Sequence, residues 1–163
     1  MKIEWKNIDN EEIAIINHWL SQEDKHNLCM TQKGWQQTAE DIGDCLKYMN
    51  NAEFKNIIGY INGKPAVALM FGIEQIKVLN LYNIVVNPKC RNMGIAKKVV
   101  LSLLNNDYTL KLTKQYTKVI ASCLPDNIKV QTMFKTLGFT DLGFDGEYFV
   151  FEKDVIRVDE RVV

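Results

Sequence analysis

Apolar residues recur at helical spacing in two segments near the start of the chain. In the first segment Ile13, Ile16 and Leu20 follow Asp9, and Asp9 with Glu12 three residues later is a helix-capping pattern. The apolar positions of the second segment are spaced alternately by four and three residues: Trp35, Ala39, Ile42, Leu46 and Met49. The spacing predicts two amphipathic helices, one that begins after Asp9 and one over residues 35–49.

Between residues 57 and 86 the pattern changes to that of strands. Two apolar runs, residues 57–61 (IIGYI) and 64–73 (KPAVALMFGI), flank the dipeptide Asn62-Gly63. Asn-Gly tolerates the positive φ angles that a two-residue turn requires, so the runs predict a β-hairpin. A third strand is expected over residues 77–86 (KVLNLYNIVV), which would complete a β-meander.

The second half of the chain alternates helix and strand. Five apolar residues at helical spacing predict a helix with one buried side: Ile95, Val99, Val100, Leu103 and Leu104. We then expect a strand over residues 118–124, a helix from about Asn127 to Gly138, and an antiparallel pair within residues 139–155. Only the strand–helix–strand connection of residues 79–124 requires parallel neighbours. The order predicts an α/β (α+β) fold, a mixed sheet with helices on both faces, and excludes a regularly alternating, doubly wound nucleotide fold.

Composition narrows the function without identifying it. The 163 residues favour a single domain over residues 1–163, and 47% hydrophobic residues suffice for one core. Twenty basic and twenty acidic side chains cancel, which argues against a nucleic-acid or membrane-surface partner. No apolar run approaches a membrane span, and the charged start is unlike a signal peptide, so we expect a cytoplasmic protein. Four cysteines without metal-ligand spacing are expected to be free thiols, and no metal site is expected.

A basic corner joins the third strand to the helix that follows it. Residues 87–98 (NPKCRNMGIAKK) carry four basic side chains: Lys89, Arg91, Lys97 and Lys98. A helix N-terminus carries about half a positive charge, so a cation there costs ~0.3–1 kcal/mol unless an anion docks on the free N–H groups. Gly94 would allow close approach of the backbone to such an anion. By itself, the segment fits an anion site and a solvated polar turn equally well, and neither G-x-x-x-x-G-K-(S/T) nor G-x-G-x-x-G is present.

Two segments together resemble a known family. Residues 86–96 (VNPKCRNMGIA) are similar to V-x-P-x-x-(R/Q)-x-x-G-x-(G/A), the acyl-CoA pyrophosphate loop of the GNAT superfamily of N-acetyltransferases. Residues 127–139, which end in MFKTLGF, resemble its later N-x-x-A-x-x-L-Y-x-K-x-G-F block. With the matching order of elements the resemblance covers roughly residues 57–151. It implies a mostly antiparallel sheet of about six to seven strands and transfer of an acetyl group from acetyl-CoA to a primary amine of a small molecule or peptide.

The resemblance also implies which residues bind coenzyme A. Backbone groups at the end of the third strand, Ile84, Val85 and Val86, would pair with the pantetheine arm. The pyrophosphate would lie on the backbone of the basic corner, with added charge from Lys97: Arg91, Asn92, Met93, Gly94, Ile95 and Ala96. Asn127 and Phe134 would contact the cofactor from the later helix, and a simple helix cap is the alternative role for Asn127.

The chain departs from the family at the catalytic positions. Phe134 stands where the family usually has a tyrosine that protonates the leaving sulfur, and Asn80 stands where some relatives place a catalytic glutamate. Replacement proton donors are Tyr82, Ser122 and Tyr148, and the nearest candidate bases are Glu74 and Glu147. Strand alternation would place four side chains on one face: Asn80, Tyr82, Ile84 and Val86. These departures keep open an alternative function, a catalytically weak acyl-CoA-binding sensor or regulatory module.

The acceptor side would be built by the first two helices and the final hairpin. Aromatic and acidic residues there suit a cationic amine, although such acids are usually only solvated: Trp19, Trp35, Tyr48, Glu23, Asp24, Glu40, Asp41 and Asp44. We therefore expect a small-molecule or peptide amine as partner, no nucleic acid and no membrane, and a monomer or homodimer.

Overall fold

The computed structural model describes residues 1–74 and 76–156, which form one mixed α/β sheet structure. The seven strands lie in the order β1-β2-β3-β4-β5-β7-β6. Their bounds are β1 Glu4–Asn7, β2 Glu53–Ile61, β3 Lys64–Ile73, β4 Val78–Val86, β5 Lys118–Cys123, β6 Thr140–Phe144 and β7 Phe149–Asp154. Every neighbouring pair is antiparallel except β4 and β5.

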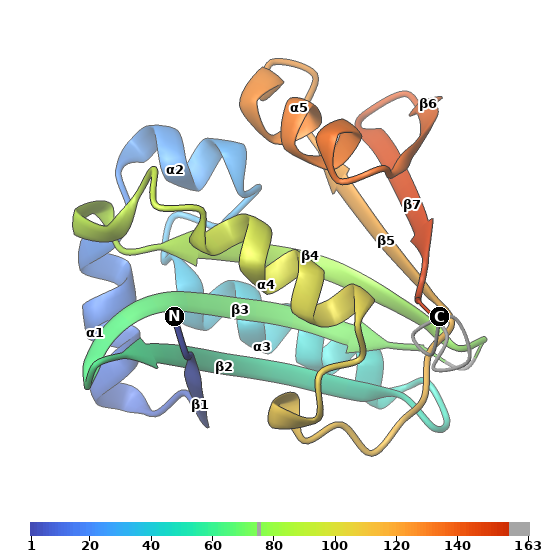
Figure 1. Ribbon diagram of the computed structural model, residues 1–163. Coiled ribbons are helices and arrows are strands. Elements are labelled where there is room, and N and C mark those ends of the chain that lie inside the picture. The colour runs from blue at the N-terminus through green and yellow to red at the C-terminus, as the bar shows by residue number, and fades with distance from the viewer. Residues whose placement is uncertain (75, 157–163) are drawn as a thin grey trace.

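Five helices cover the sheet: α1 Asn10–Trp19, α2 Gln22–Asn27, α3 Trp35–Lys47, α4 Ile95–Leu104 and α5 Ile128–Thr136. Short 3₁₀ turns follow at Pro88–Cys90 and Tyr108–Leu110. Figure 1 shows α4 in front of the meander strands and α3 behind them. The predicted fold class, a mixed and mostly antiparallel sheet with helices on both faces, is confirmed.

Whether the sequence predicted an individual element correctly depends on the length of that element. Asn62 and Gly63 have the positive φ angles (51° and 73°) that the predicted hairpin turn needs. Strand β1 and helix α2 were not predicted, because four and six residues are too few to show a periodicity and α2 buries none of its residues. The second predicted helix ends at Lys47 rather than at Met49.

Each face of the sheet has its own hydrophobic cluster. The larger cluster joins the meander to α4 and α5, and it includes Phe71, Val100 and Phe151. The smaller cluster, beneath α1 and α3, includes Ile16 and Trp35. Because both faces are covered, β3 is buried along most of its length.

A β-bulge in β4 changes which way its side chains face. Met70 is opposite Asn83 and the next residue of β3 is opposite Leu81, so Tyr82 is the additional residue. Beyond the bulge Ile84 and Val86 pack against the α4–α5 cluster, whereas Tyr82 packs against the α1–α3 cluster. The expectation that Tyr82, Ile84 and Val86 share a face is therefore wrong, because the additional residue reverses the alternation.

The parallel pair β4–β5 is short. Pairing joins Val78–Leu81 of β4 to residues 118–121 of β5, and β4 then continues to Val86 without a partner on that side. Figure 1 shows β5 and its neighbour β7 diverging from β4 beyond this point. The divergence opens one long edge of β4 in the middle of the sheet.

Candidate functional site

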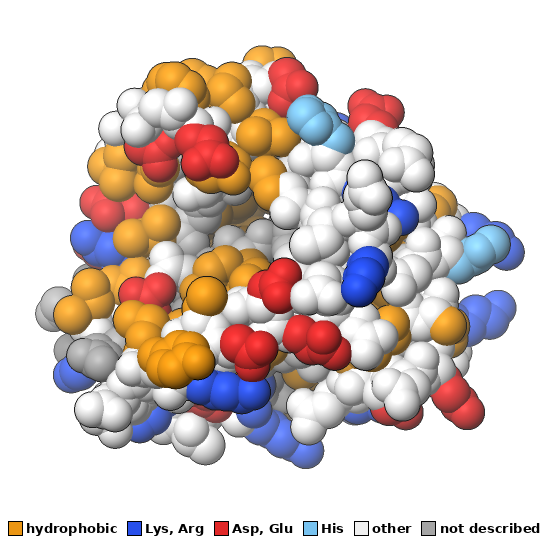
Figure 2. All heavy atoms as spheres, turned by 180° about the vertical axis from the view of Figure 1, so that it is seen from behind, with side chains coloured by type: hydrophobic (Ala, Val, Ile, Leu, Met, Phe, Trp, Pro, Cys, Tyr) orange, Lys and Arg blue, Asp and Glu red, His pale blue; other side chains and the backbone are white. Residues whose placement is uncertain are grey.

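A cleft of about 860 Å³ lies where β4 and β5 separate. Its walls come from β4, the segment between β4 and α4, the start of α4, β5, α5, and α2 with the two residues that follow it. Figure 2 shows the surface hollowed on this side of the molecule. All but one of the expected cofactor-binding residues line it: Ile84, Val85, Val86, Arg91, Asn92, Gly94, Ile95, Ala96, Lys97, Asn127 and Phe134. Met93 is the exception, since it is 64% exposed and does not line the cleft.

The backbone N–H groups in the first turn of α4 have no capping side chain. Gly94 occupies the cap position with φ 76°, and no side chain caps this helix. By contrast Asp9, Ser21 and Asn127 each accept a backbone N–H at the start of α1, α2 and α5. A Cβ at Gly94 would meet nothing within 4 Å, so space beside the glycine is open. The first turn of α4 therefore presents uncompensated donors to the cleft.

Basic side chains surround this helix start. The Arg91 guanidinium lies 3.1 Å from Asp24 Oδ2, and its Nε donates to the carbonyl of Val86 at 3.2 Å. Lys129 on α5 also lines the cleft and donates to Asn92 Oδ1 at 3.2 Å. Sequence reasoning missed Lys129, although a lysine two residues after Asn127 places a cation in the first turn of a second cleft helix.

The bulged segment of β4 is fixed by a buried amide that sequence reasoning also missed. Asn83 is 4% exposed, and one polar atom of its amide lies 2.8 and 2.9 Å from the carbonyl oxygens of Tyr82 and Leu28. Since carbonyl oxygens only accept, we assign this atom as the amide nitrogen, which donates to both. These bonds hold the residues after α2 against the bulge. The only signal in the sequence was an Asn in the apolar second half of this strand, three residues after Asn80.

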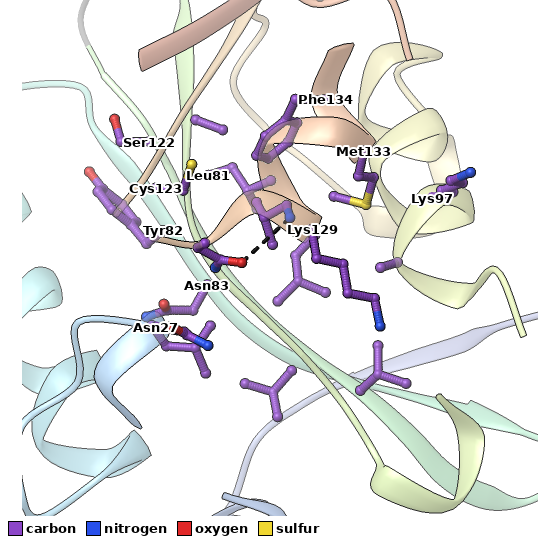
Figure 3. A pocket seen from close by; sticks show the side chains of 18 of the residues that line it. Asn27, Leu81, Tyr82, Asn83, Lys97, Ser122, Cys123, Lys129, Met133 and Phe134 are labelled. Carbon is purple, nitrogen blue, oxygen red and sulfur yellow. Dashed lines mark hydrogen bonds between the residues drawn. The ribbon is translucent and has the colours of Figure 1, made fainter. Parts of the chain in front are cut away.

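Candidate proton-transfer groups lie at the other end of the cleft. Tyr82 and Ser122 line it, and Figure 3 shows both far from Lys97. Glu74 is not part of the lining, but its Oε1 accepts from the amide of Asn80, a lining residue, at 2.6 Å. Burial, together with the charge of Glu74, raises the pKa of Tyr82 to about 12, so its phenol keeps its proton.

Phe134 and Tyr148 occupy different parts of the wall. Phe134 is 3% exposed and packs against Phe139 and Phe151, with ring centroids 5.0 and 5.5 Å apart. Tyr148 lines the cleft from the β6–β7 turn, where hydrogen bonds to Glu147 and Cys29 raise the pKa of its phenol above the ordinary value. Only Tyr148 of these two can supply a proton.

The expected acceptor-side residues divide into core and surface. Trp19 and Trp35 are 7% and 0% exposed and belong to the core beneath α1 and α3, so their placement at a substrate mouth is wrong. Tyr48 is 90% exposed. The acids of α3 have partners on their own helix: Gln36 with Glu40, Gln37 with Asp41, and Lys47 with Asp44.

Three other properties bear on the kind of site. Among residues 1–74 and 76–156, no group of three or more side chains could hold a metal ion. Within the same residues, no helix is long and apolar enough to cross a membrane. The four cysteines are free thiols.

Comparison with known proteins identifies the family. The sequence model of the acetyltransferase (GNAT) family matches residues 13–139, and the chain therefore belongs to the GNAT acetyltransferases. No curated protein sequence matches it.

Solved structures of low sequence identity share the fold. One is an acetyltransferase from Salmonella typhimurium that modifies the N-terminal serine of a 50S ribosomal subunit protein (TM-score 0.67, 15% identity, covering 94% of this chain and 95% of that chain). A spermidine N-acetyltransferase from Vibrio cholerae, in complex with CoA and spermine, gives a TM-score of 0.64 at 12% identity, with 94% and 95% coverage. An aminoglycoside acetyltransferase in complex with coenzyme A gives 0.67 at 14% identity, with the same coverage.

Proposed function

We propose that this protein is an acetyl-CoA-dependent N-acetyltransferase that acts on a primary amine of a small molecule or peptide. The observation that carries the proposal is the meeting of three features in one cleft. These are the unpartnered edge of β4, the uncapped start of α4, and the cations Arg91, Lys97 and Lys129. An extended arm that ends in a diphosphate matches this combination of an open strand edge and an anion site.

The residues present suit coenzyme A in three places. The edge of β4 at Ile84–Val86 offers backbone groups to the amides of the pantetheine arm. The free N–H groups after Gly94 would hold the pyrophosphate, with charge added by Lys97. Asn127 already caps α5 through its bond to the N–H of Val130 at 3.4 Å, so its role toward the cofactor would be secondary.

When bound, acetyl-CoA supplies an acetyl thioester. Residues of this chain would remove a proton from the amine and donate one to the leaving thiolate. An alkylamine has a pKa near ~10.4 and is mostly protonated at neutral pH, so attack requires a base. We assign that role to Glu74, acting through water and held by Asn80. The acetyl carbon–sulfur bond breaks as the carbon–nitrogen bond forms, and Tyr82 or Ser122 would return a proton to the departing thiolate.

The test is an acetylation assay on a panel of acceptors. Acetyl-CoA binding is first measured by calorimetry, and release of free thiol is then followed with polyamines, aminoglycosides, amino acids and peptides. Turnover with at least one amine supports the proposal. Absence of acetyl-CoA binding would disprove the proposed function.

Two residues favour a second candidate, an acyl-CoA-binding sensor or regulatory module. Phe134 places an apolar ring where the family has a proton donor, and Asn80 places a neutral amide where some relatives have a carboxylate. Tight binding of acetyl-CoA without thiol release on the whole panel would favour this candidate. In either case we propose a cytoplasmic protein, consistent with its free thiols, that acts as a monomer or homodimer.

A further inference from the structure

The side chain of Arg91 is held by two contacts within the cleft. Its guanidinium pairs with Asp24 on α2 at 3.1 Å, and its Nε donates to the carbonyl of Val86 at 3.2 Å. The two partners of the ion pair are separated by 67 positions in the sequence, and all three residues line the cleft. The contact thus bridges the basic corner and α2.

Both contacts compete with the cofactor that the proposed function assigns to this cleft. A diphosphate on the start of α4 would offer Arg91 a partner with two or more negative charges in place of one carboxylate. A pantetheine arm paired along β4 would approach the Val86 carbonyl, and its donor would have to share that oxygen with Arg91 Nε or displace it. The ion pair is weak enough to exchange, since the side chains of Arg91 and Asp24 are 37% and 21% exposed.

We propose that Asp24 is a positioning residue for Arg91, and that Arg91 passes from Asp24 to the diphosphate when coenzyme A binds. This inference rests on the proposed function. In the free protein Asp24 keeps the Arg91 guanidinium beside the anion site. When coenzyme A binds, Asp24 must release the guanidinium. Asp24 therefore opposes cofactor binding, although it stands next to the cofactor site.

The exchange would also connect the cofactor to the acceptor side. Helix α2 buries none of its residues, and its last residue, Asn27, forms part of the cleft wall with residues 28 and 29. Other contacts of this segment include His26 with Asp126 at 3.2 Å, the Leu28 carbonyl with Asn83 at 2.9 Å, and Cys29 with Tyr148. Loss of the Asp24–Arg91 pair would leave α2 more weakly attached, so the wall that faces the acceptor would respond to cofactor binding.

Substitutions at the two partners of the ion pair should change the affinity for coenzyme A in opposite directions. The affinity is measured by calorimetry. Asp24→Asn removes the competitor and should tighten binding about two- to fivefold, the range of a partly exposed ion pair. Arg91→Gln removes the guanidinium that would bind the diphosphate and should weaken coenzyme A binding about tenfold. In the double variant the benefit of Asp24→Asn should vanish, because Asp24 competes with the cofactor through Arg91. The other contact of its Oδ2, which accepts the backbone N–H of Ser21 at 2.9 Å, is the same in both backgrounds.

Two control variants separate exchange from simpler effects. Asp126→Asn removes an acid that pairs with His26 on α2 and does not contact Arg91, so it reports the loss of one negative charge and of another ion pair of α2 while Asp24–Arg91 stays intact. Ser21→Ala breaks the cap of α2, in which Ser21 Oγ accepts the N–H of Asp24, and leaves the carboxylate in place. Neither variant should tighten binding as Asp24→Asn does.

A second measurement follows α2 directly. Hydrogen exchange of the Lys25 and Leu28 amides, which donate within α2, should become faster when coenzyme A is added to the wild-type protein. With Arg91→Gln the addition should change nothing.

The outcomes decide the proposal as follows. Weaker or unchanged binding by Asp24→Asn would overturn it, as would equal tightening in the Arg91→Gln background or in either control. Failure of the wild-type protein to bind coenzyme A would instead remove the proposed function, a result that no comparison among variants can mimic.

Discussion

The two ends of the cleft are built from different parts of the polypeptide. The proposed cofactor end consists largely of backbone groups from one continuous segment, residues 84–97, whose shape is set by a strand end, Gly94 and a helix start. The proposed catalytic end consists of side chains from β4, β5 and two turns: Asn80, Tyr82, Ser122 and Tyr148, with Glu74 bonded to Asn80. A backbone site tolerates many changes of side chain, whereas a single substitution can remove a side-chain role.

This difference would account for a chain that keeps the family's pyrophosphate motif and departs at the proposed catalytic positions. In the segment before α4, positive φ angles restrict Asn92 (63°) and Gly94 (76°). At the catalytic end the loss of one phenol, at Phe134, leaves no group in its place on α5. The predictions below test whether the two ends are as independent as their construction suggests.

The largest effect is expected at Gly94. Replacement by Asp puts a negative charge where the diphosphate would dock, and like charges ~4 Å apart at an effective dielectric of ~20 repel by ~4 kcal/mol. Affinity for coenzyme A should fall on the order of a thousandfold. Gly63→Asp is the matched control, because Gly63 has φ 73° and an equally open Cβ position but lies in the β2–β3 turn. Unchanged calorimetric affinity in Gly94→Asp would disprove the pyrophosphate assignment.

A smaller loss, confined to turnover, is expected at Glu74. Glu74→Gln keeps a hydrogen-bond acceptor for Asn80 and removes the base, so kcat should fall about a hundredfold. Affinity for acetyl-CoA should stay unchanged, because the two ends share no contact at this residue. A kcat and pH–rate profile equal to those of the wild-type protein would remove Glu74 from the mechanism.

The substitution Phe134→Tyr restores the missing phenol, and we expect it to increase kcat. A hydroxyl on this ring would restore a donor beside the thioester, and kcat should rise about three- to tenfold if protonation of the thiolate limits the rate. The measurement is steady-state thiol release, with thermal unfolding as a check on the buried ring cluster. A fall in kcat with intact folding would show that Tyr82 or Ser122 already fills the role.

The smallest effect concerns stability at high pH. Burial and the charge of Glu74 raise the pKa of Tyr82 to about 12, above the ~10 of an unfolded chain. The folded protein thus holds this proton more tightly, and the associated stability is present below pH ~10 and lost as the pH rises toward 12. Tyr82→Phe should reduce that loss by about 1 kcal/mol in denaturant unfolding measured at several pH values. An equal loss in both proteins would show that Tyr82 is solvated.

The fold could be predicted wherever a pattern extends over enough residues. The Asn62-Gly63 turn, the apolar face of α4 and the glycine after α5 each express a local rule, and they occur where expected. The bulge at Tyr82 could not be predicted, because it arises from the pairing of β4 with β3 and leaves the alternation of the sequence unchanged. Trp35 was misplaced because amphipathic spacing identifies a buried face but not what covers it.

The candidate site divides in the same way. The proposed cofactor residues come mostly from one continuous segment, and the structure places all of them except Met93 in one cleft. Contacts such as Asp24 with Arg91, Asn83 with Leu28 and Lys129 with Asn92 join residues that are far apart in the sequence, and only the folded chain shows them. Glu74 was proposed as a base from its place in the chain, and its bond to Asn80 was not foreseen.

The short pairing between β4 and β5 has a mechanical consequence. The sheet consists of a four-stranded meander block and a three-stranded block of β5, β7 and β6, and the two are joined edge to edge by the pairing of residues 78–81 with 118–121. A hinge between the blocks would lie along this line, at the narrow end of the cleft. A ligand laid along β4 would take the place of the absent strand pairing and restrain the hinge. Occupied and empty protein should therefore differ less in shape than in how freely the two blocks swing.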